Sequence, residues 1–155
     1  MRTIILSLTL GFSLLLSDCS AGNPDKTKES SGTPKSEAVI VMTNEIFKQR
    51  VFNYEVNKTW KYEGKLPAII DFYASWCGPC RILSPKVEEI AKEYSGKIVV
   101  YKVDTDEEQA LAQSMGISSL PTLLFIPMNG KPQATMGAVP KETLVKAIND
   151  ILLVQ

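Results

Sequence analysis

Two cysteines spaced three residues apart, Cys77 and Cys80, constrain the fold of this chain more than any other feature. They follow an apolar, strand-like run at residues 68–73 and open a stretch with helical periodicity. A Cys-x-x-Cys pair in that setting is typical of a thiol–disulfide redox site. The thiolate is the reactive form of cysteine, and the free N–H groups and dipole at a helix N-terminus favour it. We therefore predict that Cys77 is the nucleophile and that Cys80, one turn later, closes a disulfide with it.

A purely stabilising disulfide and a metal site are the other interpretations of this pair. A disulfide across so short a loop removes little entropy from the unfolded chain. Zinc usually takes four ligands, whereas the chain has three cysteines and no histidine. The missing histidine also excludes Cys-His and Ser-His catalysis. We expect no metal and no other cofactor. The balance of 17 basic and 17 acidic residues argues against nucleic-acid binding.

The N-terminus resembles an export signal. Arg2 supplies a positive charge, and residues 4–16 form an apolar run. That run is shorter than the roughly 20 residues that span a bilayer as a helix, which favours a signal peptide. We predict that residues 1–19 are this signal. Residues 20–37 are polar and rich in Ser, Gly, Pro, Lys and Glu, so we predict a flexible linker there.

Cys19 ends a stretch that resembles a bacterial lipoprotein box, in which the cysteine is lipidated after cleavage. Lipidation would account for an odd third cysteine in an exported protein; an intermolecular disulfide is the competing explanation. Asp18 departs from the box, which prefers a small residue there. Cleavage near Ala21 and an uncleaved anchor therefore stay open. The expected location is the periplasm, with membrane anchorage through a lipidated Cys19.

The remaining residues, 38–155, alternate strand-like and helix-like patterns. Apolar runs predict strands at residues 39–41, 66–73, 97–103, 121–126 and 133–136, with amphipathic helices between and after them. Asp104 or Asp106 is the predicted start of the third helix, and Gly116 its end. Asn129–Gly130 predicts a hairpin that makes the last strand antiparallel. The order favours an α/β domain with a mainly parallel sheet and helices on both faces.

Over residues 38–155 the chain resembles the thioredoxin family. The matching strings are residues 71–80 (DFYASWCGPC), Pro85, residues 102–104 (KVD), residues 116–122 (GISSLPT) and residues 136–137 (MG). The resemblance implies a five-stranded mixed sheet of strand order 1-3-2-4-5 flanked by helices. It also implies a cis peptide bond between Leu120 and Pro121, in a turn that packs beside the two sulfurs.

Asp71 is a carboxylate inside an apolar strand, where burial is costly and raises the pKa of a carboxyl. We predict that Asp71 accepts a proton from Cys80, directly or through water. Lys102, on the neighbouring strand, is predicted to pair with Asp71 and moderate the shift. The structural alternative for Asp71 is a buried polar group whose hydrogen bonds are satisfied and which has no catalytic role. For Lys102 it is a solvated lysine at the end of a strand.

The predicted substrate-facing surface surrounds the cysteine pair. The resemblance implies that the backbone of Leu120 pairs with an extended substrate segment, as an added strand does. Gly137 would leave room for the approaching chain, although a simple turn glycine is an equal interpretation. The surface residues are Trp76, Gly78, Pro79, Leu120, Pro121 and Gly137.

The Gly-Pro dipeptide between the cysteines resembles that of the reducing family members. We therefore predict a monomeric protein-disulfide reductase that acts on protein disulfides and draws electrons from a membrane-spanning or periplasmic donor. An oxidase or isomerase, and a non-catalytic binding module, are the alternatives. Residues 53–65 form a longer link than is usual in the family; an extended first helix is the favoured interpretation, and a partner-docking surface the other.

Overall fold

A five-stranded mixed sheet forms the centre of residues 38–154, the part of the chain that this computed structural model describes. The strands are β1 (Val39–Val41), β2 (Ala68–Tyr73), β3 (Val99–Asp104), β4 (Thr122–Ile126) and β5 (Gln133–Met136). Their order is β1-β3-β2-β4-β5; β3 pairs in parallel with β1 and β2, while β4 is antiparallel to β2 and β5. The predicted order and antiparallel edge are thus confirmed. The predicted signal peptide, linker and Cys19 lie outside the described residues.

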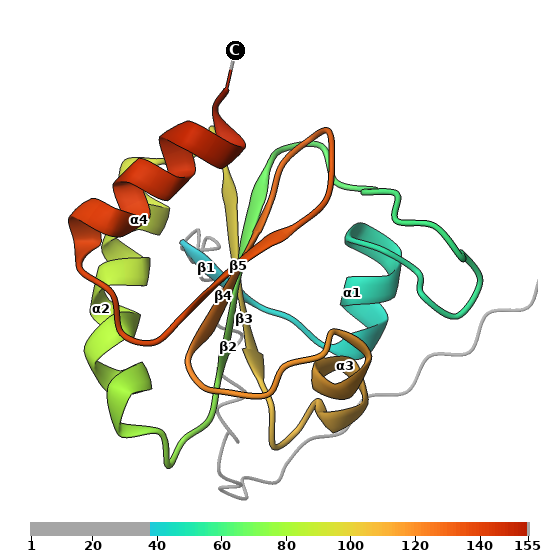
Figure 1. The fold of residues 1–155 in the computed structure, drawn as a ribbon, viewed down its shortest axis with the longest axis horizontal. Coiled ribbons are helices and arrows are strands. Elements are labelled where there is room, and N and C mark those ends of the chain that lie inside the picture. The colour runs from blue at the N-terminus through green and yellow to red at the C-terminus, as the bar shows by residue number, and fades with distance from the viewer. Residues whose placement is uncertain (1–37, 155) are drawn as a thin grey trace, which may run out of the picture. The chain divides into compact units, whose positions relative to one another are not determined.

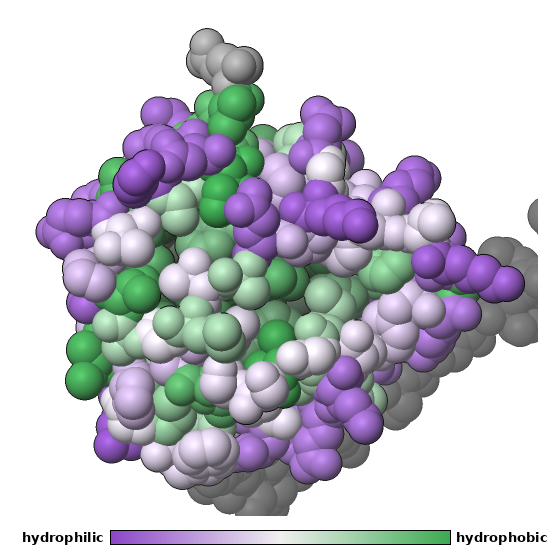
Figure 2. Space-filling model, viewed as in Figure 1, coloured by the Kyte–Doolittle hydropathy of each residue, from purple (hydrophilic) through white to green (hydrophobic). Residues whose placement is uncertain are grey.

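Helices cover both faces of the sheet (Figure 1). One face carries α2 (Gly78–Glu93) and α4 (Lys141–Ala147), which continues as the π-helical turn η1 (Ile148–Leu152); the other carries α1 (Asn44–Arg50) and α3 (Gln109–Ser114). Strand β2 is buried on both sides, which explains its nearly continuous apolar run. On the side shown in Figure 2, hydrophilic side chains gather at the rim around a more apolar centre. Within the described residues, no helix has the length and hydropathy needed to cross a bilayer.

The third helix begins later than predicted. The N–H of Asp106 donates to the Asp104 carboxylate over 3.0 Å, so this side chain stabilises a turn instead of capping a helix. Helix α3 starts only at Gln109. Its predicted end is confirmed: Gly116 follows the helix with φ +69°, a left-handed conformation that glycine adopts without strain.

The link at residues 53–65 is not an extension of the first helix, so that prediction was wrong. The Asn53 side chain accepts the N–H of Glu55 over 3.1 Å, and this local turn competes with continued helix. The link nevertheless contributes to the core on the α1 side of the sheet. The aromatic side chains that pack there are Phe52, Tyr54, Trp60 and Tyr62.

We expect Trp60 to stabilise this link by packing alone. The centroids of the Trp60 and Phe52 rings lie 4.8 Å apart. The buried indole N–H of Trp60 has no hydrogen-bond partner among the described residues. A Trp60→Ala variant should therefore lose about 2 kcal/mol of unfolding free energy in urea titrations. Trp60→Phe keeps an aromatic ring and removes the unpaired N–H, so it should match the wild type within about 0.5 kcal/mol. Equal losses in both variants would contradict the packing role.

Candidate active site

Cys77 and Cys80 form a disulfide at the N-terminus of α2, with their sulfurs 2.01 Å apart and their Cα atoms 5.3 Å apart. Cys77 is the N-cap residue of the helix, in an extended conformation. Gly78 and Pro79 occupy the first helical positions, where the missing N–H of proline costs nothing. Two predicted site residues thus become the first turn of α2, and the disulfide sits at its mouth.

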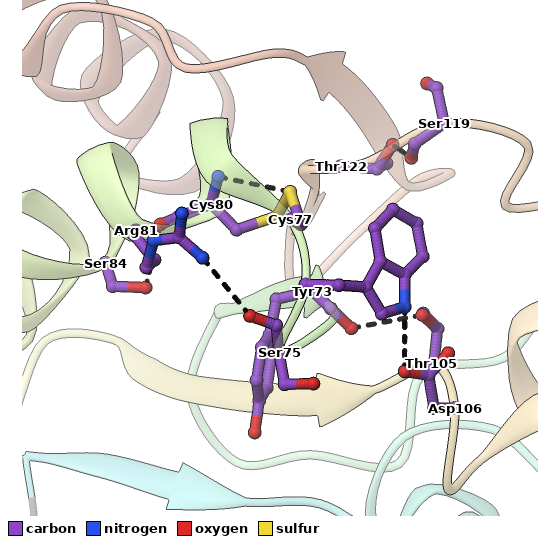
Figure 3. The surroundings of a disulfide bond; sticks show 11 residues. Tyr73, Ser75, Cys77, Cys80, Arg81, Ser84, Thr105, Asp106, Ser119 and Thr122 are labelled. Atoms are coloured by element: carbon purple, nitrogen blue, oxygen red, sulfur yellow. Dashed lines mark hydrogen bonds between the residues drawn. A yellow bond between two sulfur atoms is a disulfide. The ribbon is translucent and has the colours of Figure 1, made fainter.

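The surroundings of the Cys77 sulfur favour negative charge. The N–H of Cys80 donates to Cys77 Sγ over 3.2 Å (Figure 3). Helix α2 is 16 residues long and has no acidic residue in its first turn. The guanidinium of Arg81 lies beside this turn and reaches the carbonyl of Ser75 over 3.4 Å. After reduction, the helix dipole, the Cys80 N–H and the nearby cation would together stabilise a thiolate at Cys77.

Asp71 is buried within β2, the strand that precedes the cysteine pair, with 4% of its surface exposed. Burial raises the pKa of its carboxyl to about 7, while the charge of Lys102 acts in the opposite direction. Oδ1 of Asp71 accepts no hydrogen bond from the described residues. Asp71 and Ser84 line the same cavity of about 100 Å³, and the Ser84 hydroxyl donates to the Cys80 carbonyl over 2.9 Å. Asp71 and Ser84, which lies one helical turn after Cys80, therefore line one cavity beside α2. Proton transfer from Cys80 to Asp71 stays a prediction.

Lys102 lies on β3 directly beside Asp71 on β2 and lines the same cavity. Among the described residues, however, the ammonium of Lys102 has no carboxylate oxygen within 4.0 Å. The predicted pairing thus takes the form of a through-space attraction and not of a salt bridge. Its effect is to lower the pKa of Asp71 from the value that burial alone would produce.

Two loops complete the surface around the disulfide. The Leu120–Pro121 bond is cis, as predicted, and Leu120 packs against the cluster formed by Ala74 and the two cysteines. Gly137, with φ +86°, donates its N–H to the carbonyl of Pro121 over 2.8 Å. The structure therefore brings the helix mouth and Leu120 together, and ties the Gly137 loop to the proline turn.

Trp76 lies in the turn before the disulfide with 68% of its surface exposed. Its indole N–H donates to the Asp106 carboxylate over 2.9 Å. The sequence indicated Asp106 only as a possible helix start and not as a site residue, because 30 residues separate it from Trp76 and only the fold brings them together. Ser84 was also missed, although it follows Cys80 by four residues and helical periodicity places both on one face.

The geometry defines a class of protein. Because the Cys77–Cys80 disulfide lies at the first turn of α2, where a thiolate would be stabilised, it can be opened and closed by thiol–disulfide exchange, which defines a thiol–disulfide oxidoreductase.

Comparisons with known proteins give the family. The sequence model described as Thioredoxin matches residues 38–150. A thioredoxin of Borreliella burgdorferi is 48% identical over 111 residues, covering 72% of this chain and 95% of that protein. A chloroplastic M-type thioredoxin of Spinacia oleracea is 37% identical over 145 residues, covering 94% and 77%. The crystal structure of a Malassezia sympodialis thioredoxin superposes with a TM-score of 0.60 and 33% identity, covering 73% of this chain and 90% of that one.

This chain therefore belongs to the thioredoxin family, and its activity is thioredoxin-type protein-disulfide reduction. Cys77 and Cys80 are its redox-active pair.

Proposed function

We propose that this protein reduces disulfides of exported proteins in the periplasm, from a lipid anchor on Cys19. The observation that carries the thiol–disulfide chemistry is the Cys77 sulfur at the mouth of α2, which already accepts the N–H of Cys80. The Gly78–Pro79 dipeptide between the cysteines, which resembles that of the reducing family members, supports the direction. The apolar N-terminal run and the cysteine after it support the location. The protein would act as a monomer and would receive electrons from a membrane-spanning or periplasmic donor.

The reaction begins with the reduced protein. The Cys77 thiolate attacks one sulfur of a substrate disulfide, and the other substrate sulfur leaves as a thiolate and takes up a proton. Cys80 then transfers its proton to Asp71 and attacks the Cys77 sulfur. The second substrate sulfur leaves as a thiolate, which is protonated in turn, and the Cys77–Cys80 disulfide forms. Two electrons from the donor and the proton held by Asp71 then restore the Cys77 thiolate and the Cys80 thiol.

Substrate docking would use the backbone next to the cis proline. Leu120 is partly exposed, lies against the disulfide cluster, and precedes a proline that carries no N–H. An extended substrate segment would pair with the Leu120 backbone and run between Trp76 and Gly137. Because backbone groups make this contact, the surface would accept many sequences.

The steady-state redox form in cells distinguishes a reductase from an oxidase. Acid quenching followed by alkylation with a mass-tagged maleimide separates the dithiol from the disulfide on a gel. We expect mostly dithiol, because a reductase is kept reduced by its donor. A predominantly oxidised Cys77–Cys80 pair would favour the oxidase alternative and overturn the proposed direction of electron flow.

The location is tested through Cys19. In a Gram-negative host that expresses the full chain, the wild type should label with radioactive palmitate and sediment with the membranes. Cys19→Ala should lose the label and most of the membrane fraction, because one lipid-modified residue is the proposed anchor. The matched control is Cys80→Ala, which leaves the anchor intact. Membrane sedimentation of Cys19→Ala equal to that of the wild type would contradict the lipid anchor.

A further inference from the structure

The loop from β5 to α4 holds Gly137 beside the active site, and it runs along α2 in Figure 1. Two backbone hydrogen bonds shape this loop. The N–H of Gly137 donates to the carbonyl of Pro121 over 2.8 Å, and the N–H of Val139 donates to the carbonyl of Gly137 over 3.0 Å. The loop is thus joined to the proline turn by main-chain contacts.

Lys86 joins the same loop to the active-site helix. Its Nζ donates to the carbonyl of Val139 over 3.0 Å, across 53 residues of sequence, and the contact is partly buried. Within residues 38–154, no carboxylate oxygen lies within 4.0 Å of this ammonium. Lys141, by contrast, joins α4 to α2 through ion pairs with Glu89 and Glu93. Lys86 therefore joins α2 to the loop through a hydrogen bond to a backbone carbonyl and not through an ion pair.

A series of contacts now connects the nucleophile to the substrate surface. Lys86 lies on α2, the helix whose first turn holds Cys77, so it is fixed relative to that sulfur. From Lys86 the series passes through Val139 and Gly137 to Pro121. Shifting the loop would change the spacing between the helix mouth and Gly137. The side chain of Val139 packs against the apolar core cluster. Loss of the Lys86 contact should therefore loosen the loop without unfolding the domain.

We propose that Lys86 is a positioning residue that determines how tightly protein substrates bind, because it holds the Gly137 loop at a fixed distance from Cys77. This inference rests on the proposed docking of substrates between Leu120 and Gly137. Lys86 takes no part in the chemistry of the sulfurs. Lys86 should affect only the binding of an extended polypeptide. The rate of reduction of a small disulfide that does not reach the loop should therefore not depend on Lys86.

The test compares Lys86→Met with the wild type in dithiothreitol-driven reduction of insulin and of 2-hydroxyethyl disulfide. Methionine keeps the apolar stem and removes the donor. We expect KM for insulin to rise about three- to tenfold, which matches the net worth of one typical intramolecular hydrogen bond. The kcat for insulin and the rate with 2-hydroxyethyl disulfide should stay within about twofold. Amide hydrogen exchange at Gly137 should become faster.

Two variants serve as controls. Lys86→Arg retains a cationic donor and should restore KM. Lys92→Met removes an exposed lysine from the same helix, away from the loop, and should resemble the wild type. If Lys86→Met proves unfolded in thermal scans, Lys86→Glu, whose carboxylate keeps a polar head but offers no donor, takes its place in the same assays.

An unchanged KM for insulin in a folded Lys86→Met variant would overturn the assignment. So would equal losses with insulin and 2-hydroxyethyl disulfide, since these would mean an effect on the sulfurs. A wild-type protein that cannot reduce insulin at all would remove the proposed function and the role of Lys86 with it. If the wild type reduces insulin and Lys86→Met reduces it equally well, the proposed function stands and only the role of Lys86 is removed.

Discussion

A Cys77→Ser variant should lose protein-disulfide reduction by on the order of a thousandfold or more, as enzymes do when their nucleophile is removed. Cys80→Ser should lose turnover but keep the first step. It retains the thiolate that attacks the substrate and lacks the thiol that resolves the mixed disulfide. Incubation with a disulfide-bonded protein should therefore trap a covalent complex with Cys80→Ser and none with Cys77→Ser, as seen on non-reducing gels.

The two cysteine variants also test the other functional classes. If Cys80→Ser were inert and Cys77→Ser formed the trapped complex, the roles assigned to the two sulfurs would be reversed. If the double variant still supported the cellular function of the protein, the chain would act as a binding module. Both variants are isosteric to within one atom, so unfolding is an unsatisfactory explanation for either loss.

Replacing Asp71 with asparagine should stabilise the protein at and above neutral pH. The pKa of the carboxyl is about 7 in the folded protein against an ordinary value of 3.8. The folded state therefore binds the proton more tightly, and wild-type stability should fall as the pH rises from about 4 to about 7. Asparagine removes this loss. At pH 8 the gain should be about 2 to 4 kcal/mol, after allowing for the unpaired amide.

The measurement for Asp71 is urea unfolding of the oxidised wild type and Asp71→Asn at pH 4 and at pH 8. The difference between them should be small at pH 4, where the carboxyl is protonated in the folded state and only partly ionised in the unfolded state, and large at pH 8. A gain that is the same at both pH values would show that titration of Asp71 does not cause it. In the reduced protein, Asp71→Asn should slow the release of a trapped substrate near neutral pH, since Cys80 loses its proton acceptor.

Lys102 offers a matched perturbation of the same carboxyl. Its charge lowers the pKa of Asp71, so Lys102→Met should raise that pKa and extend the fall in stability to higher pH. The shift would be visible in the pH dependence of unfolding. An unchanged profile would mean that solvent already screens the attraction, because Lys102 makes no salt bridge with Asp71.

The sheet and the disulfide were predictable because strong local signals agree with one another. Strand β2 is apolar on both faces, as expected for a strand covered by helices on both sides, and Asp71 interrupts this apolar run as a buried carboxyl. The two cysteines lie at the junction of this strand with α2, so local sequence alone places them at a helix mouth.

The features that escaped prediction depend on contacts between distant residues or on competing turns. Asp104 prefers to stabilise a turn, which delays α3, and the Asn53 side chain does the same after α1. The hydrogen bonds of Trp76 with Asp106 and of Lys86 with Val139 span 30 and 53 residues. No local sequence pattern indicates such pairs, because only the fold brings their residues together.

The reduction potential of the Cys77–Cys80 couple tests the central claim most directly. Equilibration with mixtures of reduced and oxidised glutathione, read by alkylation and mass spectrometry, gives this value. A couple whose function is to reduce protein disulfides should lie near the thioredoxin value of about −270 mV. A value near −120 mV, typical of strong periplasmic oxidants, would contradict the account of this protein as a reductase.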